Sequence, residues 1–192
     1  MPFAQSLLLT IYYALLAVVC VFMLYRALLI VRYFRRGRHD PEPASRFAQD
    51  PVVTVQLPLY NEQFVVERLI ETVCMLDWPR DKLEVQVLDD STDETVSIVA
   101  AKVAEMRDRG YDVKHLHRTD RSGYKAGALK EAVPVARGNF LAVFDADFVP
   151  EPDFLRRAMD HFTADDVGFV QGRWAYLNRE YSWLTQGMGM LM

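Results

Sequence analysis

The sequence predicts an α/β protein with a mainly parallel sheet, preceded by one transmembrane helix. After residue 51, short β-branched runs alternate with amphipathic helical patterns, which is typical of an α/β domain. Three of the expected strands end in unusual polar residues. An uncharged apolar stretch near the amino terminus predicts the membrane span. The length of 192 residues suits one domain with an appendage.

The membrane span is expected at Leu7 to Leu24. This stretch carries no charge, and as a helix it would cover about 27 Å, close to the thickness of the hydrocarbon core. A buried core helix is one alternative. A cleaved signal peptide is another, but Met1 to Ser6 is uncharged and the arginines follow the stretch. By the positive-inside rule, these arginines place the downstream domain in the cytoplasm, anchored to the inner or plasma membrane.

Charge divides the chain into a basic start and an acidic remainder. Residues 1–38, the anchor with its basic flank, hold five arginines and no acid, so the remainder has 17 bases against 26 acids. So acidic a domain is a poor match for nucleic acid, which proteins bind with clustered Lys and Arg. We therefore expect no nucleic-acid partner. Residues 39–51, with prolines and mixed charge, are expected to link the anchor to a domain at 52–192.

Four short apolar runs are expected to form the strands. The first, at 52–57, is β-branched, and Pro58 is expected to end it. The others are expected at 83–88, 111–116 and 140–144. Because helical patterns separate the four runs, the sheet should be mainly parallel and covered on both faces. Ligands of such sheets bind beyond the carboxyl ends of the strands.

Four helical patterns follow the strands. Apolar residues recur at spacings of three and four over 62–76, as in an amphipathic helix. The next helix is expected at 94–109, where Ser91 and Glu94 have the spacing of a capping box. The third is expected at 125–136, and the fourth from Pro152, as its first residue, to about residue 162.

Polar residues follow three of the expected strands. The first strand leads into 58–62, the second into 89–93 and the fourth into 145–147. Each segment alone would suit a helix cap or a partner for the helix dipole. Together they fall on one edge of the predicted sheet, where several carboxylates repel one another and a cation is the natural compensation.

The most specific metal-binding pattern is Asp145-Ala146-Asp147. Its two carboxylates are hard oxygen ligands, which suit Mg²⁺ or Mn²⁺, and these ions complete their shells with substrate phosphates and water. A metal there would stabilise a departing diphosphate as its charge develops. A receiver-like signalling domain also binds Mg²⁺ at paired aspartates after a strand, but the transmembrane anchor and the D-x-D pattern at the end of the fourth strand weigh against this alternative.

A glycine-containing basic loop, residues 118–127, precedes the third helix. Its glycines permit close backbone approach, and its basic residues, Lys125 among them, offer positive charge to a phosphate. The alternative is a solvated basic loop without a ligand. The loop has no Walker pattern, and no G-x-G-x-x-G follows any strand, which argues against ordinary ATPases and dinucleotide dehydrogenases.

Five ordered motifs carry a specific resemblance to a known family. They are LPLYNE (57–62), VLDDSTDET (87–95), RSGYKAGAL (121–129), FDADFVP (144–150) and VQGRWAYLN (170–178). Their order and spacing resemble those of the family 2 glycosyltransferases, most of all the membrane-bound, processive, cellulose-synthase-like and glucomannan-synthase-like branch. The resemblance covers about residues 52 to 186.

This resemblance implies a Rossmann-like GT-A fold that binds a nucleotide sugar. It also implies inverting transfer of a hexose to a polysaccharide or glycolipid acceptor, with UDP-glucose as the expected donor and GDP-mannose as the alternative. Carried over by motif, the residues that would line the nucleoside pocket are Pro58, Tyr60 and Glu62, and Asp89 or Asp90 would contact the base. Lys125 would lie near the nucleotide, and Asp145 near the ribose and diphosphate. Asp147 would bind the metal together with Asp145, and both of these aspartates would be catalytic. His115 and His117 are not assigned as ligands.

The resemblance ends before the family's general base. In the family, that Asp and a Gln-x-x-Arg-Trp helix follow the strand that VQGRW resembles. We therefore expect this chain to hold the donor-binding half of an enzyme, whose turnover needs the missing base. The alternative is a catalytically inactive nucleotide-sugar-binding fragment that works with a partner chain.

Overall fold

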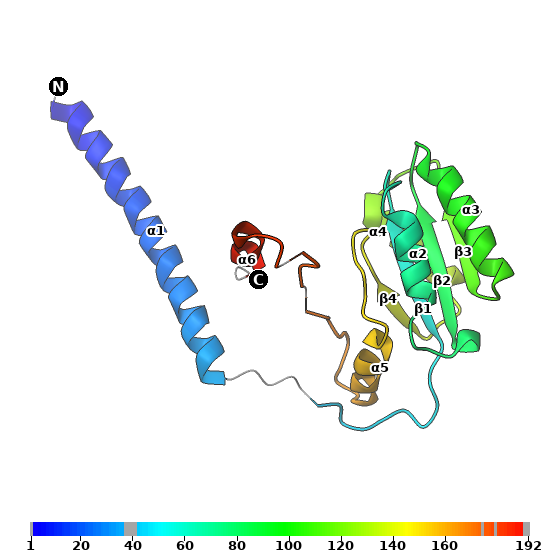
Figure 1. The fold of residues 1–192 in the computed structure, drawn as a ribbon. Coiled ribbons are helices and arrows are strands. Elements are labelled where there is room, and N and C mark those ends of the chain that lie inside the picture. Colours follow the sequence, from blue (N-terminus) through cyan, green and yellow to red (C-terminus); the bar gives the residue numbers. More distant parts are fainter. Residues whose placement is uncertain (1, 37–41, 174, 179, 190–192) are drawn as a thin grey trace. The chain divides into compact units, whose positions relative to one another are not determined.

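The computed structural model describes residues 2–36, 42–173, 175–178 and 180–189 (Figure 1). The chain divides into two compact units, Met1–Glu42 and Pro43–Met192, and each is described by itself.

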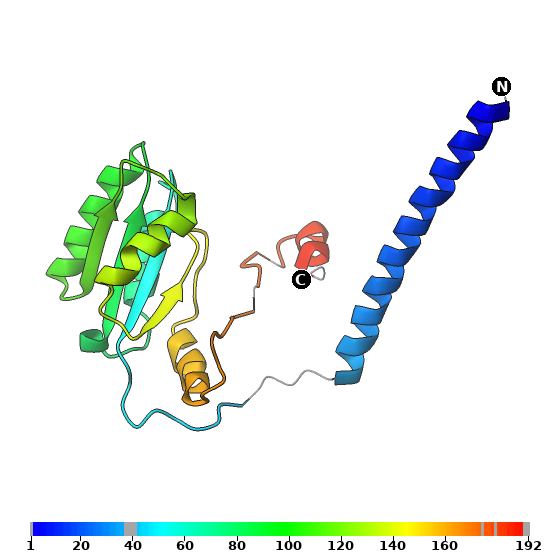
Figure 2. The same ribbon diagram turned by 180° about the vertical axis from the view of Figure 1, so that it is seen from behind.

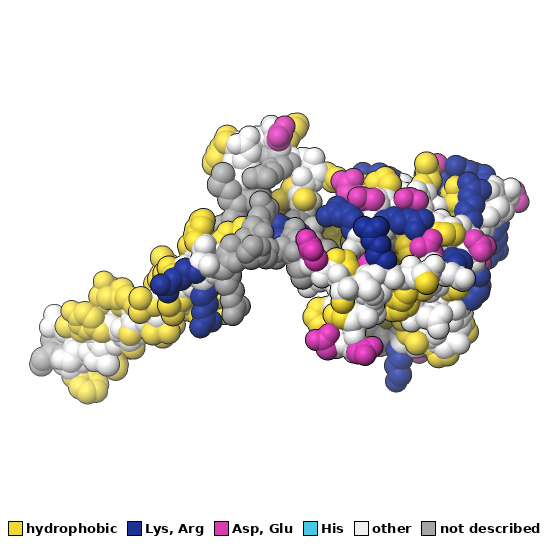
Figure 3. Space-filling view, turned by 90° about the horizontal axis from the view of Figure 1, so that it is seen from below, with side chains coloured by type: hydrophobic (Ala, Val, Ile, Leu, Met, Phe, Trp, Pro, Cys, Tyr) yellow, Lys and Arg dark blue, Asp and Glu magenta, His cyan; other side chains and the backbone are white. Residues whose placement is uncertain are grey.

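The first unit contains α1 (Pro2–Arg36), a helix of 35 residues. The expected helix at 7–24 is therefore present, and it extends further at both ends. Its segment Phe3–Arg35 is long and apolar enough to cross a membrane. Figure 3 shows apolar side chains along α1 and basic side chains toward its carboxyl-terminal end.

The second unit is built on four parallel strands, in agreement with the sequence-based prediction. They are β1 (Val53–Leu59), β2 (Leu83–Asp89), β3 (Asp112–His117) and β4 (Phe140–Val143). The order in the sheet is β3-β2-β1-β4. The chain thus runs outward from β1 to β3 and then returns to place β4 on the other side of β1. The crevice where such an order reverses is the usual ligand site of open parallel sheets.

Helices cover both faces of this sheet. One face packs against α2 (Val66–Cys74) and α3 (Thr95–Asp108), and the other against α4 (Tyr124–Ala132) (Figures 1 and 2). The larger core forms on the α2 and α3 side, because alternate residues of β1 and β2 point there and are fully buried. A smaller core around Leu88 and Ala128 lies under α4. The remaining helical segments are η1 (Arg80–Lys82), η2 (Val133–Val135), α5 (Phe154–Met159), η3 (Asp160–Thr163) and α6 (Trp183–Gly189).

The α4 side of β1 and β2 also carries buried polar residues at the amino-terminal half of the strands. The carboxylate of Glu84 is fully buried and accepts hydrogen bonds from the Thr54 hydroxyl (2.5 Å), the Lys114 ammonium (2.5 Å) and the Arg137 backbone N–H (2.7 Å). Burial alone would raise the pKa of Glu84, but these hydrogen bonds outweigh it and hold the pKa below its usual range. Through Arg137, this network connects the segment that precedes β4 to the sheet.

Pro58 does not end β1, as the sequence led us to expect. The strand continues to Leu59, because the missing N–H of Pro58 falls where no partner strand needs it. The backbone groups of residue 56 face β4, since Phe144 N–H donates to the Gln56 carbonyl, and those of Pro58 face the same side. The β4 ladder ends at Val143, opposite Gln56.

Several expected helix boundaries also differ from the structure. Residues 63–65 form a turn, so α2 begins at Val66. The capping box of Ser91 and Glu94 is not formed: the Thr95 N–H donates instead to the Asp93 carboxylate (3.0 Å). The third helix ends at Ala132 and gives way to the 3₁₀ turn η2, which contains Pro134, a residue that α-helix interiors exclude.

The last expected elements are shorter than predicted. Pro152 is not the first residue of α5, which begins at Phe154. The Pro152 carbonyl instead accepts a hydrogen bond from the N–H of Asp77 (2.8 Å), in the loop after α2. The strand expected at VQGRW is absent from its described residues, 170–173, whereas Trp174 lies outside the described residues. Part of the segment expected as a linker contacts the domain, since Phe47 packs on Phe140 with ring centroids 5.8 Å apart.

Candidate active site

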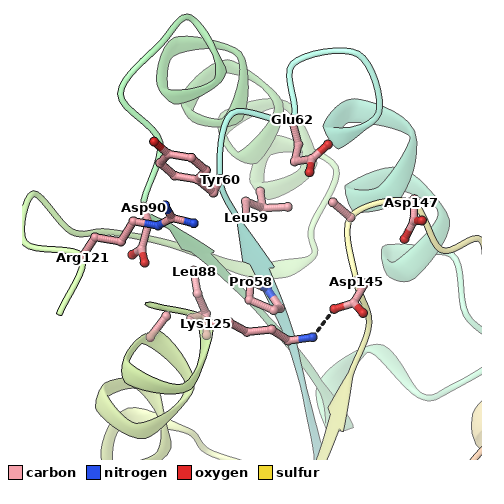
Figure 4. A pocket seen from close by; sticks show the side chains of 12 residues that line it. Pro58, Leu59, Tyr60, Glu62, Leu88, Asp90, Arg121, Lys125, Asp145 and Asp147 are labelled. Atoms are coloured by element: carbon pink, nitrogen blue, oxygen red, sulfur yellow. Dashed lines mark hydrogen bonds and ion pairs between the residues drawn. The ribbon is translucent and has the colours of Figure 1, made fainter. Parts of the chain in front are cut away.

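A cavity of about 440 Å³ opens at the carboxyl ends of β1, β2 and β4. It therefore lies at the point where the strand order reverses. Figure 4 shows Tyr60 and Arg121 on one side and Asp145 and Asp147 on the opposite side. The lining residues are Pro58, Leu59, Tyr60, Glu62, Leu88, Asp90, Arg121, Lys125, Ala128, Asp145, Ala146 and Asp147.

Most of the residues singled out from the sequence line this cavity. The one exception is Asp89, which the cavity does not include. Conversely, Arg121 lines the cavity, although we predicted no individual role for it; its place three residues after Arg118 in a glycine-containing loop was the available signal. The lining thus contains four carboxylates and two basic side chains. A diphosphate entering this cavity would meet excess negative charge unless a cation accompanied it.

An ion pair crosses the cavity between Lys125 and Asp145. The Lys125 ammonium comes from the first turn of α4, and the Asp145 carboxylate from the loop after β4 (Figure 4). Both side chains are about half exposed, so a ligand can reach them. Asp147 is exposed and has no ion-pair partner among the described residues. Its carboxylate is therefore available to a cation.

Arg121 stacks on an aromatic ring at the other side of the cavity. Its guanidinium carbon lies 3.3 Å from the ring centroid of Tyr60 and 5.1 Å from that of Tyr124. Such cation–π stacking fixes the planar guanidinium without using its hydrogen-bond donors. The Nε of Arg121 is buried and has no hydrogen-bond partner in the described part of the chain. A buried donor left unpaired beside a cavity is a site for an acceptor atom of a ligand.

Asp90 is clamped by a second arginine. The Nε of Arg118 donates to Oδ1 of Asp90 (2.7 Å) and Nη2 donates to Oδ2 (2.6 Å), a bidentate geometry. Another nitrogen of the same guanidinium pairs with Glu131 (2.8 Å). Because Arg118 also donates to the Tyr124 carbonyl (3.2 Å), it fastens the basic loop and α4 to the end of β2. Each Asp90 oxygen keeps one lone pair for a ligand.

The loops after β1 and β2 are tied to each other by Asn61. Its backbone N–H donates to the Ser91 hydroxyl (2.9 Å), and its side-chain oxygen accepts from the Thr92 N–H (2.9 Å). Asn61 has a φ of 56°, and asparagine tolerates this left-handed conformation better than most residues. This turn aims Tyr60 and Glu62, on either side of it, at the cavity.

Asp89 is an anchor for the end of β2. It is fully buried; its Oδ1 accepts a hydrogen bond from the Ser91 N–H (2.9 Å), and its Oδ2 lies 2.9 Å from Nε2 of His115. Burial raises the pKa of Asp89, but the hydrogen bonds from His115 and Ser91 more than offset this and lower the pKa below its usual range. Leu88 and Asp90, its two neighbours, line the cavity.

The donor atoms at Asp145 and Asp147 fit Mg²⁺ or Mn²⁺. Both ions take oxygen ligands, and Mg²⁺ is usually bound by one or two carboxylates together with substrate phosphates. Here the two side chains are accessible and one of them is unpaired. The pair is thus suited to an ion that arrives with a phosphate.

Comparison with known proteins agrees with this chemistry. Residues 54–189 match the family described as Glycosyl transferase family 2. The chain is 39% identical over 172 residues to probable glucomannan 4-beta-mannosyltransferase 1 of Arabidopsis thaliana, covering 83% of this chain and 31% of that relative. A solved structure of the mannosyltransferase PcManGT from Pyrobaculum calidifontis in complex with GDP-Man and Mn²⁺ is similar with a TM-score of 0.68 and 33% identity, covering 80% of this chain and 44% of that one. This chain therefore spans less than half the length of either relative.

Proposed function

Because the chain belongs to glycosyl transferase family 2, and its mainly parallel sheet is the GT-A-like fold of its structural neighbours, we propose that the cavity binds GDP-mannose. The observation that carries this proposal is the cavity itself, in which Asp145, Asp147 and Lys125 converge with the unpaired Nε of Arg121. GDP-mannose is favoured over UDP-glucose by the name of the Arabidopsis relative and by the GDP-Man bound to the Pyrobaculum enzyme.

The protein is proposed to transfer mannose to a polysaccharide acceptor. Asp145 and Asp147 would hold Mg²⁺ or Mn²⁺, which as a Lewis acid stabilises the diphosphate charge that develops when the bond to the sugar breaks. Lys125 adds a positive charge on the α4 side of the same cavity. Tyr60 and Arg121 form a flat surface that suits the base or ribose.

Calorimetric titration of the full chain in detergent tests the donor assignment. We expect GDP-mannose and GDP to bind in the presence of Mn²⁺, and to bind at least tenfold more weakly with EDTA, because the carboxylates then repel the diphosphate. UDP-glucose should bind more weakly than GDP-mannose under both conditions. Equal affinity with and without Mn²⁺ would contradict the metal role, and tighter binding of UDP-glucose would contradict the donor assignment. Transfer of labelled mannose then separates an active enzyme from a binding fragment.

α1 is proposed to anchor the domain to the membrane with the domain on the cytoplasmic side. The helix is long and apolar enough to cross a bilayer, and the arginines beyond its most apolar part favour that orientation. Protease added to right-side-out vesicles should leave the domain intact, whereas permeabilised vesicles should show cleavage. Cleavage of the domain in intact vesicles would contradict the topology.

A further inference from the structure

A second group of metal-binding side chains lies at the carboxyl ends of β2 and β3. Asp89, His115 and His117 each offer one ligand atom, and these three atoms lie within 4.8 Å of one another. Oδ2 of Asp89 is 2.9 Å from Nε2 of His115 and 3.5 Å from Nδ1 of His117. The parallel register places the two histidines opposite Val87 and Asp89 on neighbouring strands. All three side chains therefore lie on one face of the sheet.

This group is separate from the donor cavity. The residues on either side of Asp89 line that cavity, and Asp89 does not. On the strand, Val87 belongs to the core under α2 and α3, whereas Leu88 belongs to the core under α4. Since side chains alternate between the faces of a strand, Asp89 shares the face of Val87. The Asp89 side chain thus lies on the side of the sheet opposite Leu88, whereas His117, at the end of β3, also lines a small cavity with Leu88.

The distances from the Asp89 carboxylate to the two imidazoles suit a small cation. A tetrahedral zinc ion about 2.0–2.1 Å from each ligand atom separates those atoms by roughly 3.3–3.4 Å. The two distances from Oδ2 of Asp89 bracket this value. The imidazole rings are not stacked: their centroids are 6.0 Å apart and their planes are inclined by 56°, so both nitrogens approach the same carboxylate oxygen.

We propose that Asp89, His115 and His117 bind a divalent cation of the zinc type. Two imidazoles and one carboxylate are ligands that Zn²⁺ accepts and that Mg²⁺ does not favour, in contrast to the all-oxygen pair in the donor cavity. The carboxylate is fully buried, while 33% of the His117 side chain is exposed. Water can therefore occupy the fourth position from the His117 side.

A cation bound here would stabilise the segments that border the donor cavity. It would join the ends of β2 and β3 through the three ligands. The other carboxylate oxygen of Asp89 accepts a hydrogen bond from the Ser91 N–H, and the Ser91 hydroxyl accepts one from the Asn61 N–H. The bound ion would thus stiffen the turn that carries Tyr60 and Glu62. The simpler alternative is that His115 donates a hydrogen bond to a buried carboxylate and no metal binds.

Metal titration of the full chain, purified in detergent without a histidine tag and stripped with EDTA, tests this site. We expect one Zn²⁺ to remain per chain after dialysis against Zn²⁺ and desalting, with two imidazole ligands visible by X-ray absorption. His115→Asn and His117→Asn should each lose at least 90% of the bound Zn²⁺. Two controls should retain it: His161→Asn removes a histidine elsewhere, and Asp147→Asn alters the donor cavity.

A thermal readout guards against variants that merely unfold. Zn²⁺ at about 100-fold over its dissociation constant should raise the melting temperature of the wild type by roughly 5–10 °C. In EDTA, His117→Asn should melt within a few degrees of the wild type, and Zn²⁺ should no longer raise its melting temperature. Unchanged Zn²⁺ content in both histidine variants, or its loss in Asp147→Asn alone, would overturn the proposal. An absence of Zn²⁺ from the wild type would favour the hydrogen-bond alternative.

Discussion

Lys125 at the start of α4 and Asp145 after β4 form an ion pair across the cavity, 20 residues apart in the sequence (Figure 4). The ammonium contacts Oδ1 of Asp145, one of the two oxygens that this carboxylate would offer to a cation. This ammonium can also move toward a bound phosphate, because the Lys125 side chain is flexible and half exposed. On the proposed function, we therefore expect a metal and the lysine to compete for Asp145 until a bound diphosphate interacts with both.

Lys125→Gln should separate these two effects. Without nucleotide, the variant should bind Mn²⁺ more tightly than the wild type, because the competing positive charge is removed. With Mn²⁺ present, it should bind GDP about 10- to 100-fold more weakly, the loss expected for one charge-assisted hydrogen bond. Calorimetry measures both, and Lys130→Gln, an exposed change on the same helix, should alter neither. Weaker Mn²⁺ binding in the absence of nucleotide would contradict the competition.

Asp147→Asn should remove the metal dependence of nucleotide binding without unfolding the domain. The carboxylate is exposed and unpaired among the described residues, so its loss should change the free energy of unfolding by less than about 1 kcal/mol. GDP titrations with and without Mn²⁺ should then give the same weak affinity. Asp166→Asn, an exposed carboxylate outside the cavity, is the matched control. Loss of folding in Asp147→Asn would instead assign this residue a structural role.

Arg118→Lys should destabilise the domain although it preserves the charge. The fork to Asp90 needs two nitrogens in one plane, and only 13% of the Arg118 side chain and 4% of the Asp90 side chain are exposed. We expect a loss of about 1–3 kcal/mol in the free energy of unfolding, measured with urea. Arg157→Lys, at a pair whose side chains are 73% and 56% exposed, should change it by less than about 0.5 kcal/mol. Equal effects in the two variants would show that the fork is not needed.

Much of this arrangement could be predicted from the sequence, because it depends on local patterns. Apolar runs separated by helical patterns predicted that the strands are parallel, and parallel strands bring their carboxyl ends to one edge. That is why segments as distant as 58–62 and 145–147 were expected together, and they line one cavity. Pro58 was misread because its tolerance in β1 depends on where β4 stops pairing, which is a property of the neighbouring strand.

The pairing within the site could not be predicted, because it joins residues far apart in the sequence. Asp89 and Asp90 are adjacent and chemically identical, yet one meets His115 and the other meets Arg118, 28 residues away. Asp90 lines the cavity with Leu88, whereas Asp89 shares the opposite face of β2 with Val87. The stacking of Arg121 on Tyr60 likewise needs the relative positions of two loops.

The buried Glu84 network predicts a loss of stability in acid. Its pKa is lowered in the folded protein, so ionised Glu84 contributes stability above the pKa of an unfolded glutamate, about 4.3, and loses it as the pH falls through the folded value. The free energy of unfolding should therefore decrease below about pH 4.5, with a slope of up to about 1.4 kcal/mol per pH unit from this group. Glu84→Gln should be less stable at neutral pH and show a shallower acid slope. The same slope as in the wild type would show that other carboxylates dominate, and Glu151→Gln, an exposed change, serves as the control.

Gly127→Ala should damage the basic loop and, through it, donor binding. A Cβ at Gly127 would lie 2.0 Å from the Ser122 carbonyl oxygen and 3.0 Å from its carbon, and neither is a flexible side-chain end that can move aside. The loop between Arg118 and α4 would have to shift, which should lower the free energy of unfolding by about 1–3 kcal/mol.

The same shift should weaken GDP binding more than global unfolding explains, because the displaced segment carries Arg121 and precedes Lys125, whose positions in the cavity depend on it. Gly168→Ala is the matched control: its Cβ would meet nothing within 4 Å, so stability should change by less than about 0.5 kcal/mol. Urea unfolding and GDP titration with Mn²⁺ on both variants check this. If Gly127→Ala matched Gly168→Ala in stability and in affinity, the close packing of this loop would not be what positions Arg121 and Lys125.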